Sequence, residues 1–125
     1  MPRRPQRGGP AVARPVFFAA ALFFAALACH AESAPAGRGR LLLAQYQCGS
    51  CHSIPGVASA GGRVASSLKG FGARSYIAGR LANRPQTLAR WIQDPKSLVP
   101  DTTMPNMAVT PDDARDMAAY LLELK

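Results

Sequence analysis

The sequence predicts a small all-α domain of about three helices joined by long loops. Three segments space their apolar residues three and four apart, which is the spacing of one face of a helix. No run alternates apolar and polar residues in the way that a strand does, and no internal repeat is present. The pattern starts at about residue 39 of 125, so the sequence predicts one domain over residues 39–125.

The first two predicted helices each have one apolar face. The first covers residues 39–47, and its apolar residues are Leu42, Leu43 and Tyr46. The second covers residues 85–93. It begins at Pro85, because the first turn does not need the missing N–H, and it ends before Pro95, because the residue before a proline avoids helical angles. Its apolar residues are Leu88, Trp91 and Ile92.

The third predicted helix, residues 110–125, has the strongest start signal. Thr110 is a good N-cap, Pro111 suits the first turn, and the acidic residues that follow favour the positive end of a helix. Its apolar stripe consists of Met117, Tyr120, Leu121 and Leu124. We expect the first and third helices to pack together through these stripes, with Tyr46 and Tyr120 among the contacts.

Directly after the first predicted helix comes the motif Cys48-Gly49-Ser50-Cys51-His52. Two cysteines two residues apart with a histidine after the second are the attachment pattern of one c-type haem. Each thiol would form a thioether bond with a porphyrin vinyl group, and His52 would bind the iron. A zinc ribbon would need a second Cys/His pair, and a thioredoxin-type dithiol would need a βαβ context; the sequence offers neither. A structural disulfide is a further alternative.

Residues 53–84 have little periodicity and many glycines, so we expect a loop without a strand pair. A short helical turn is expected at residues 75–78. A loop of this length in a small domain indicates a function, and wrapping one edge of a haem would be such a function. The porphyrin would also provide apolar surface for a domain too short to bury much of its own.

Residues 1–31 have the features of an export leader. A thirteen-residue apolar run without charge, residues 16–28, is too short for a comfortable membrane span and matches the central region of a signal peptide. The basic residues before it are Arg3, Arg4, Arg7 and Arg14. We therefore expect the domain to lie in the periplasm or at the outer face of the cytoplasmic membrane.

The end of this leader allows three outcomes. Cleavage after Ala28 or Ala31 would release a soluble protein, lipidation of Cys29 would anchor it, and an uncleaved leader would also anchor it. Cys29 is the odd cysteine once two others are assigned to thioethers. Residues 32–38 are rich in Ala, Pro and Gly and are expected to form a linker.

The charge distribution indicates the kind of partner. The formal net charge is +8, and the part from Arg38 onward has eleven Lys or Arg and six Asp or Glu. Its middle is basic through Arg63, Lys69, Arg74, Arg80, Arg84, Arg90 and Lys96. An exported domain meets no nucleic acid, so we expect steering toward a redox protein with an acidic docking surface. The alternative is a solvated face without a partner. We expect a monomer.

The second iron ligand is expected to be a methionine. His52 is the one histidine of the predicted domain, because His30 lies at the leader boundary. Met117 is on the apolar stripe of the last helix and is most simply a core residue. Met104 and Met107 both lie on residues 99–109, a segment that three prolines keep free of helix and that can act as a strap over the haem.

The chain resembles a small class I cytochrome c over residues 39–125. The resemblance consists of the CGSCH motif, a Leu-x-x-Trp-Ile-x-Asp-Pro stretch at 88–95, the pair Met104-Pro105 and the Ala-Tyr-Leu of the last helix. It implies the small cytochrome c fold around one haem c. It also implies His52/Met104 ligation, because the family's methionine follows this proline by nine residues, as Met104 follows Pro95. Trp91 would pack near that methionine.

One departure from the family concerns the proximal histidine. The family usually has Gly-Pro-x-Leu where this chain has Ala65-Ser66-Ser67-Leu68. The Ser66 carbonyl can still accept the His52 N–H, but without the rigidity of proline we expect His52 to be oriented less firmly. The residues expected to contact the haem propionates or to line the pocket are Arg74, Tyr76, Asn83 and Trp91.

The resemblance implies a one-electron carrier rather than an enzyme. Electrons would pass from a membrane or periplasmic donor to a terminal oxidase or reductase. Two alternatives remain at this point: a haem subunit of a larger dehydrogenase or oxidase, and a haem enzyme or ligand-binding protein with an open sixth position on the iron.

Overall fold

The computed structural model describes residue 1 and residues 34–125. The predicted leader with Cys29 lies, apart from its first residue, outside the described residues. In the described part, no helix combines the length and the apolar character needed to cross a membrane.

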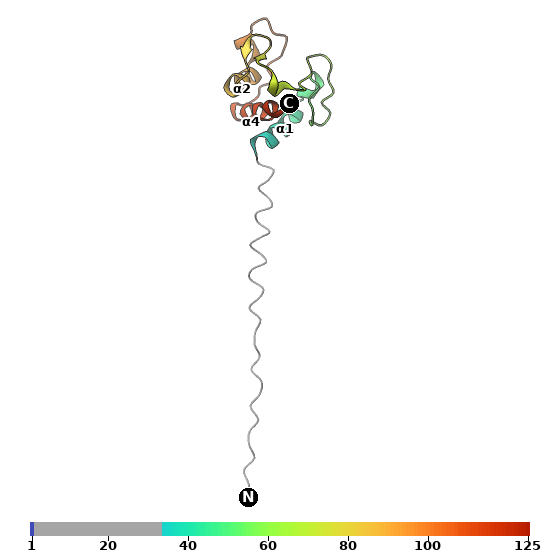
Figure 1. Ribbon diagram of the computed structural model, residues 1–125, viewed down its shortest axis with the longest axis vertical. Coiled ribbons are helices and arrows are strands. Elements are labelled where there is room, and N and C mark those ends of the chain that lie inside the picture. Colours follow the sequence, from blue (N-terminus) through green and yellow to red (C-terminus); the bar gives the residue numbers. More distant parts are fainter. Residues whose placement is uncertain (2–33) are drawn as a thin grey trace. The chain divides into compact units, whose positions relative to one another are not determined.

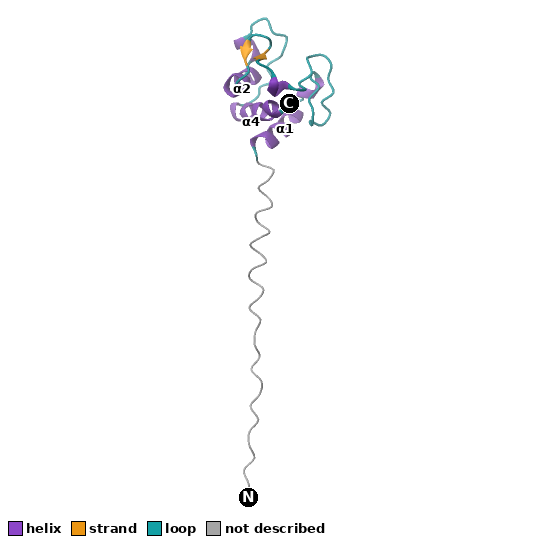
Figure 2. Cartoon of the chain, viewed as in Figure 1, coloured by secondary structure: helices purple, strands orange, loops and turns teal. Residues whose placement is uncertain are grey.

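Figure 2 shows mostly helices and loops, which confirms the all-α prediction. The elements in order are α1 (Pro35–Gln45), η2 (Cys48–Ser50), η3 (Phe71–Ala73), β1 (Tyr76–Ile77), β2 (Leu81–Ala82), α2 (Pro85–Gln93), α3 (Pro95–Leu98) and α4 (Pro111–Glu123).

The first and last helices, α1 and α4, pack against each other as predicted (Figure 1). Gly39 is buried at the crossing, where a Cβ atom would overlap the backbone carbonyl oxygen of Asp116. Arg38 forms ion pairs with Asp113 and Asp116. The Tyr46 hydroxyl donates to Asp113 Oδ2 at 2.8 Å, so the predicted contact by Tyr46 is confirmed. The glycine therefore allows a close approach that the surrounding polar contacts then stabilise.

Helix α1 begins earlier than predicted. It starts at Pro35 rather than Gly39, so residues 35–38 of the expected linker are helical. Pro35 suits the first turn because its missing N–H is not needed there. The preceding Ala34 makes no side-chain cap, so no capping signal in the sequence marks this start.

Helix α4 starts as predicted. Thr110 Oγ1 accepts the Asp113 N–H at 3.3 Å, which confirms Thr110 as the N-cap. The helix ends at Glu123, two residues before its predicted end. The Tyr120 hydroxyl donates to the Pro55 carbonyl at 2.7 Å, and a packing contact between Tyr120 and α1 stays a prediction. Tyr120 thus joins α4 to the loop that follows the cysteine motif.

Helix α2 has the predicted bounds, and its apolar face is buried. Leu88, Trp91 and Ile92 are all at most 8% exposed. Pro95 ends α2 as predicted, but it also begins the four-residue helix α3, which the sequence did not predict. A helix of one turn has too few residues to produce a periodic pattern.

Residues 53–84 remain mostly loop, with two errors in the prediction, because a helical turn was expected and a strand pair was not. The helical turn expected at residues 75–78 is wrong, and a short antiparallel strand pair, β1 with β2, occupies this region instead. Ala78 and Gly79 adopt φ values of 49° and 70°, which turn the chain back on itself. Strands of two residues are too short to show alternation in a sequence.

Candidate functional site

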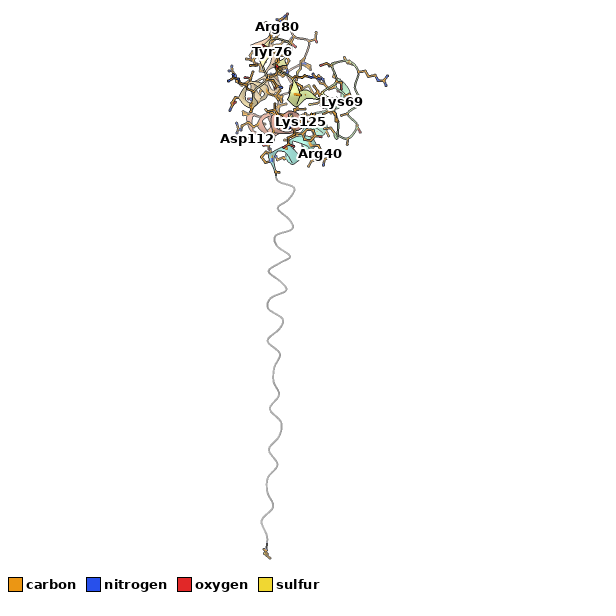
Figure 3. The ribbon with its side chains drawn as sticks, in the orientation of Figure 1. Arg40, Lys69, Tyr76, Arg80, Asp112 and Lys125 are labelled. Atoms are coloured by element: carbon orange, nitrogen blue, oxygen red, sulfur yellow. The ribbon has the colours of Figure 1, made fainter. Side chains whose placement is uncertain are left out.

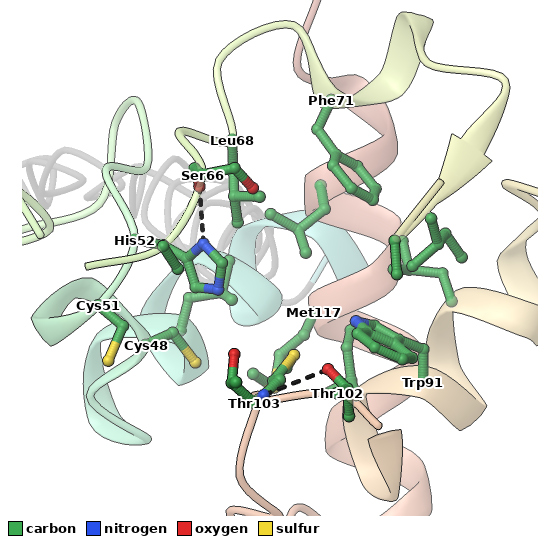
Figure 4. Close-up of a pocket in the computed structure, with 18 of the residues that line it drawn as sticks. Cys48, Cys51, His52, Ser66, Leu68, Phe71, Trp91, Thr102, Thr103 and Met117 are labelled. Carbon is green, nitrogen blue, oxygen red and sulfur yellow. Dashed lines mark hydrogen bonds between the residues drawn. The ribbon is translucent and has the colours of Figure 1, made fainter. Parts of the chain in front are cut away.

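A tight turn after α1 brings two thiols and an imidazole to one wall of a cavity. Gln47 adopts a left-handed conformation with φ 56°, and η2 follows it. The N–H groups of Cys51 and His52 both donate to the Cys48 carbonyl, at 3.3 and 3.0 Å. Figure 4 shows Cys48, Cys51 and His52 on one side of the cavity and Trp91 on the other. The spacing of the motif therefore directs all three side chains to one space.

Cys48 and Cys51 form no disulfide with each other. Both are free and half-buried, and both line the cavity. Burial raises the pKa of the Cys48 thiol above its usual value, because the apolar wall disfavours the thiolate. The disulfide alternative therefore does not describe this pair, whose thiols are directed to the cavity as a covalent attachment would require.

The orientation of His52 is set by a backbone carbonyl. His52 Nδ1 lies 2.8 Å from the Ser66 oxygen (Figure 4), so the expectation that this carbonyl can accept the bond is confirmed. A carbonyl oxygen only accepts, so Nδ1 must carry the proton. The lone pair of Nε2 is then available to a metal, and the bond strengthens it as a ligand.

The loop that carries Ser66 is fastened on both sides by backbone hydrogen bonds. The Ala65 N–H donates to the Cys51 carbonyl at 2.9 Å, and the Leu68 N–H donates to the Ser53 carbonyl at 2.8 Å. These bonds tie the loop to Cys51 of the motif and to Ser53, which follows the motif. They supply part of the restraint that a proline at position 66 would have supplied. A less firmly oriented His52 side chain stays a prediction.

Arg74 adds a second restraint on the same loop. Its Nη2 donates to the carbonyls of Ser67 and Lys69, at 2.5 and 3.1 Å. The guanidinium also lies over the Phe71 ring, 5.4 Å from its centroid. Arg74 lines the cavity, and in addition it positions the loop from which the Ser66 carbonyl reaches His52.

Asn83 was expected to contact the haem propionates or to line the pocket, and the first of these stays a prediction. It is not among the residues that line the cavity. Its Nδ2 donates to the carbonyls of Phe71 and Arg74 at 3.1 and 3.0 Å, so it restrains η3 and the residue after it. In the described residues its buried Oδ1 has no hydrogen-bond partner.

The cavity has a volume of about 420 Å³ and reaches into the core of the domain. Seven of the eight predicted site residues line it: Cys48, Cys51, His52, Arg74, Tyr76, Trp91 and Met104. Eight further buried apolar side chains line it as well: Leu43, Leu68, Phe71, Ile77, Leu88, Ile92, Met117 and Leu121. A large apolar group with polar edges would fit such a space, because apolar walls surround it and the thiols, the imidazole and a thioether face it.

The structure separates the three candidate methionines. Met104 is half-buried and lines the cavity, whereas Met107 is 38% exposed and does not line it. Met117 is fully buried in α4, as expected of a core residue, and it also contributes to the cavity wall. The geometry therefore favours Met104 over Met107 as the thioether available to a bound group.

Thr102 and Thr103 line the cavity but were not among the predicted residues. The Met104 N–H donates to Thr102 Oγ1 at 3.2 Å, which restrains the backbone next to the methionine. Figure 4 shows both threonines across the cavity from Ser66. Their position beside the Met104-Pro105 pair was the one signal in the sequence that could have identified them.

Helices surround an apolar cavity with two thiols and an imidazole in one wall and a thioether on a strap, and these donor groups fit an apolar prosthetic group that contains a metal. The chain belongs to the cytochrome c family, as a class I c-type cytochrome, because the sequence model described as Cytochrome c matches residues 36–125. The family implies covalently bound haem c and electron transfer, and the predicted small cytochrome c fold is confirmed.

A comparison with curated proteins gives one relative. The chain is 35% identical over 91 residues to cytochrome c oxidase subunit 2 of Alkalihalophilus pseudofirmus. The match covers 72% of this chain and 26% of that protein, so the chain spans about a quarter of the length of this relative. No solved structure matches the chain.

Proposed function

We propose that this chain is a single-haem, one-electron carrier in which Cys48 and Cys51 hold haem c and His52 and Met104 bind its iron. When bound, the haem would supply an iron that accepts and releases one electron, and a thioether ligand from Met104 would favour the ferrous form. The observation that carries the proposal is the arrangement of these four side chains around one apolar cavity.

Each of the four side chains would have a separate task. The thiols of Cys48 and Cys51 would form the covalent bonds, and both are free and line the cavity. His52 would bind iron through Nε2, because Nδ1 is engaged by the Ser66 carbonyl. Met104 would fill the opposite position from the strap. With both positions filled, no substrate needs to reach the iron, which favours a carrier over the open-site alternative.

The surface supports a redox protein as partner. The basic residues predicted for docking are exposed, apart from half-buried Arg74: Arg63, Lys69, Arg80, Arg84, Arg90 and Lys96. We therefore propose an exported carrier that docks on an acidic face of its electron donor or acceptor. Electron transfer to such a partner should slow as salt concentration rises, and a rate independent of salt would contradict the proposal.

A second candidate function follows from the relative. Cytochrome c oxidase subunit 2 contains a stretch similar to most of this chain, so we also consider a haem domain that stays attached to an oxidase. Purification at moderate salt distinguishes the two. A stable complex with oxidase subunits would favour attachment, and a monomer that elutes alone would favour the diffusing carrier.

Absorption spectra of the matured protein in both redox states test the ligands. Wild type should show a c-type spectrum with a sulfur-to-ferric-iron charge-transfer band. Met104→Ala should lose this band, and the matched control Met107→Ala should keep it, because Met107 does not line the cavity. A high-spin wild-type spectrum that Met104→Ala leaves unchanged would refute the ligand assignment and favour the open-site alternative.

A further inference from the structure

The strap of residues 99–109 has few hydrogen bonds to the rest of the domain. Two hydrogen bonds stay near Met104, from the Thr102 N–H to the Val99 carbonyl and from the Met104 N–H to Thr102 Oγ1. The Val99 N–H donates to the Pro95 carbonyl at the end of α3. Beyond that junction, the hydrogen bonds that leave the strap within residues 34–125 are the two between Asp101 and Arg80. The buried side chains of Val99 and Val109 also hold the strap, so in the described residues this pair is its polar connection to the hairpin.

The pair is bidentate and joins two sides of the cavity. Arg80 Nη1 donates to Asp101 Oδ1 at 2.8 Å, and Nη2 donates to Oδ2 at 2.9 Å. Arg80 comes from the turn between β1 and β2, where its N–H donates to the Ile77 carbonyl at 3.0 Å. Ile77 and Tyr76 of this hairpin line the cavity, and so does Met104 of the strap.

Neither Arg80 nor Asp101 lines the cavity, so each can act on a bound group only through the segment that carries it. Asp101 lies three residues before Met104 on the strap. Figure 3 shows Arg80 near Tyr76 at one end of the domain, away from Arg40 and Asp112. A second, shallower pocket of about 260 Å³ is lined by the pair together with Ala78 and Thr103, and therefore lies between the hairpin and the strap.

We propose that the Arg80–Asp101 pair is a latch that holds the strap against the hairpin and so keeps Met104 in place over the iron. The proposal rests on Met104 as the iron ligand, which is part of the proposed function. Both side chains are well exposed, at 61% and 65%, so the latch is a weak one. The planar guanidinium makes two parallel hydrogen bonds to the carboxylate, which fixes the relative orientation of the two side chains; a lysine in place of Arg80 could not do this. Arg80 and Asp101 are positioning residues in this assignment.

Imidazole binding to the ferric holoprotein measures how readily Met104 leaves the iron. Imidazole can bind only when Met104 has moved away, so a looser strap raises its apparent affinity. Arg80→Ala and Asp101→Asn should each raise this affinity about two- to five-fold, which is the range for an exposed ion pair. The double variant should show the same increase as either single variant, because one interaction is lost in all three.

Three controls make the test specific. Arg84→Ala removes an exposed arginine that has no ion pair in the described part of the chain, and it should leave the affinity unchanged. The exchange Arg80→Asp with Asp101→Arg should bring the affinity back toward the wild-type value. Unfolding in denaturant should differ little between the single variants and wild type, so general destabilisation can be distinguished from strap release.

The outcomes separate the latch from the proposed function. If wild type shows the sulfur-to-iron band and the single variants bind imidazole as wild type does, the latch is refuted and the ligand assignment remains. Single effects that add in the double variant would also refute the latch. If wild type lacks the band and Met104→Ala changes nothing, the ligand assignment itself fails and the latch with it.

Discussion

The crossing of α1 and α4 predicts an unusual response to a glycine-to-alanine substitution. In the interior of a helix, alanine in place of glycine normally stabilises the fold by about 0.5–1 kcal/mol. In Gly39→Ala the new methyl group would overlap the carbonyl oxygen and carbon of Asp116, which are backbone atoms and cannot rotate away. Overpacking of this kind costs about 1–3 kcal/mol. We therefore expect Gly39→Ala to lower the free energy of unfolding by about 1–2 kcal/mol, because the overlap exceeds the gain in helix propensity.

Urea unfolding of the holoprotein measures this difference directly. Gly61→Ala is the matched control, because a methyl group there meets no atom within 4 Å and its backbone has no positive φ. We expect that control to change the free energy of unfolding by less than about 0.5 kcal/mol. A Gly39→Ala protein as stable as wild type, or more stable, would refute the reasoning, because the two helices would then have room for a side chain.

Two further predictions concern polar contacts. The Tyr46 hydroxyl, with other partners, lowers the pKa of Asp113, so the stability that this carboxylate adds is present above its unfolded pKa of about 3.9 and is lost as pH falls toward the lower folded value. The stability difference between wild type and Asp113→Asn in urea should therefore shrink from pH 6 to pH 3, and a constant difference would contradict this. Arg74→Lys keeps the charge but loses the fork that spans two carbonyls, so the Ser66–His52 bond should weaken. His52 then becomes a poorer donor to ferric iron, and a potentiometric titration should give a higher potential; a lower or equal one would count against the role of Arg74.

Local sequence signals made the last helix predictable, whereas the β1–β2 hairpin depends on a backbone conformation that no local signal indicates. Thr110 and Pro111 mark the start of α4 through capping chemistry that acts within one turn. The turn between β1 and β2 depends on a left-handed Ala78, a conformation that alanine rarely adopts and that its sequence context does not indicate. The early start of α1 could not be predicted for a related reason, because Ala34 provides no cap.

The residues of the candidate site also divide into those that the sequence could predict and those that it could not. Cys48, Cys51 and His52 could be predicted because five consecutive residues carry the chemistry. Asn83 could not be placed, because its amide braces η3 through contacts that no pattern encodes. The Arg80–Asp101 pair joins residues 21 apart in the sequence, and neither residue belongs to a periodic element. Only the fold brings such residues together.

The contact between α1 and α4 also has a consequence for how the chain folds. Arg38 and Asp116 are 78 residues apart, so this contact closes a loop that contains most of the domain. Closing such a loop costs about 4 kcal/mol of chain entropy before any element inside it is ordered. Contacts of such high sequence separation slow folding, and a transition state that includes them would already enclose the cysteine motif and the strap. Substitutions at this crossing should then slow folding more than they speed unfolding.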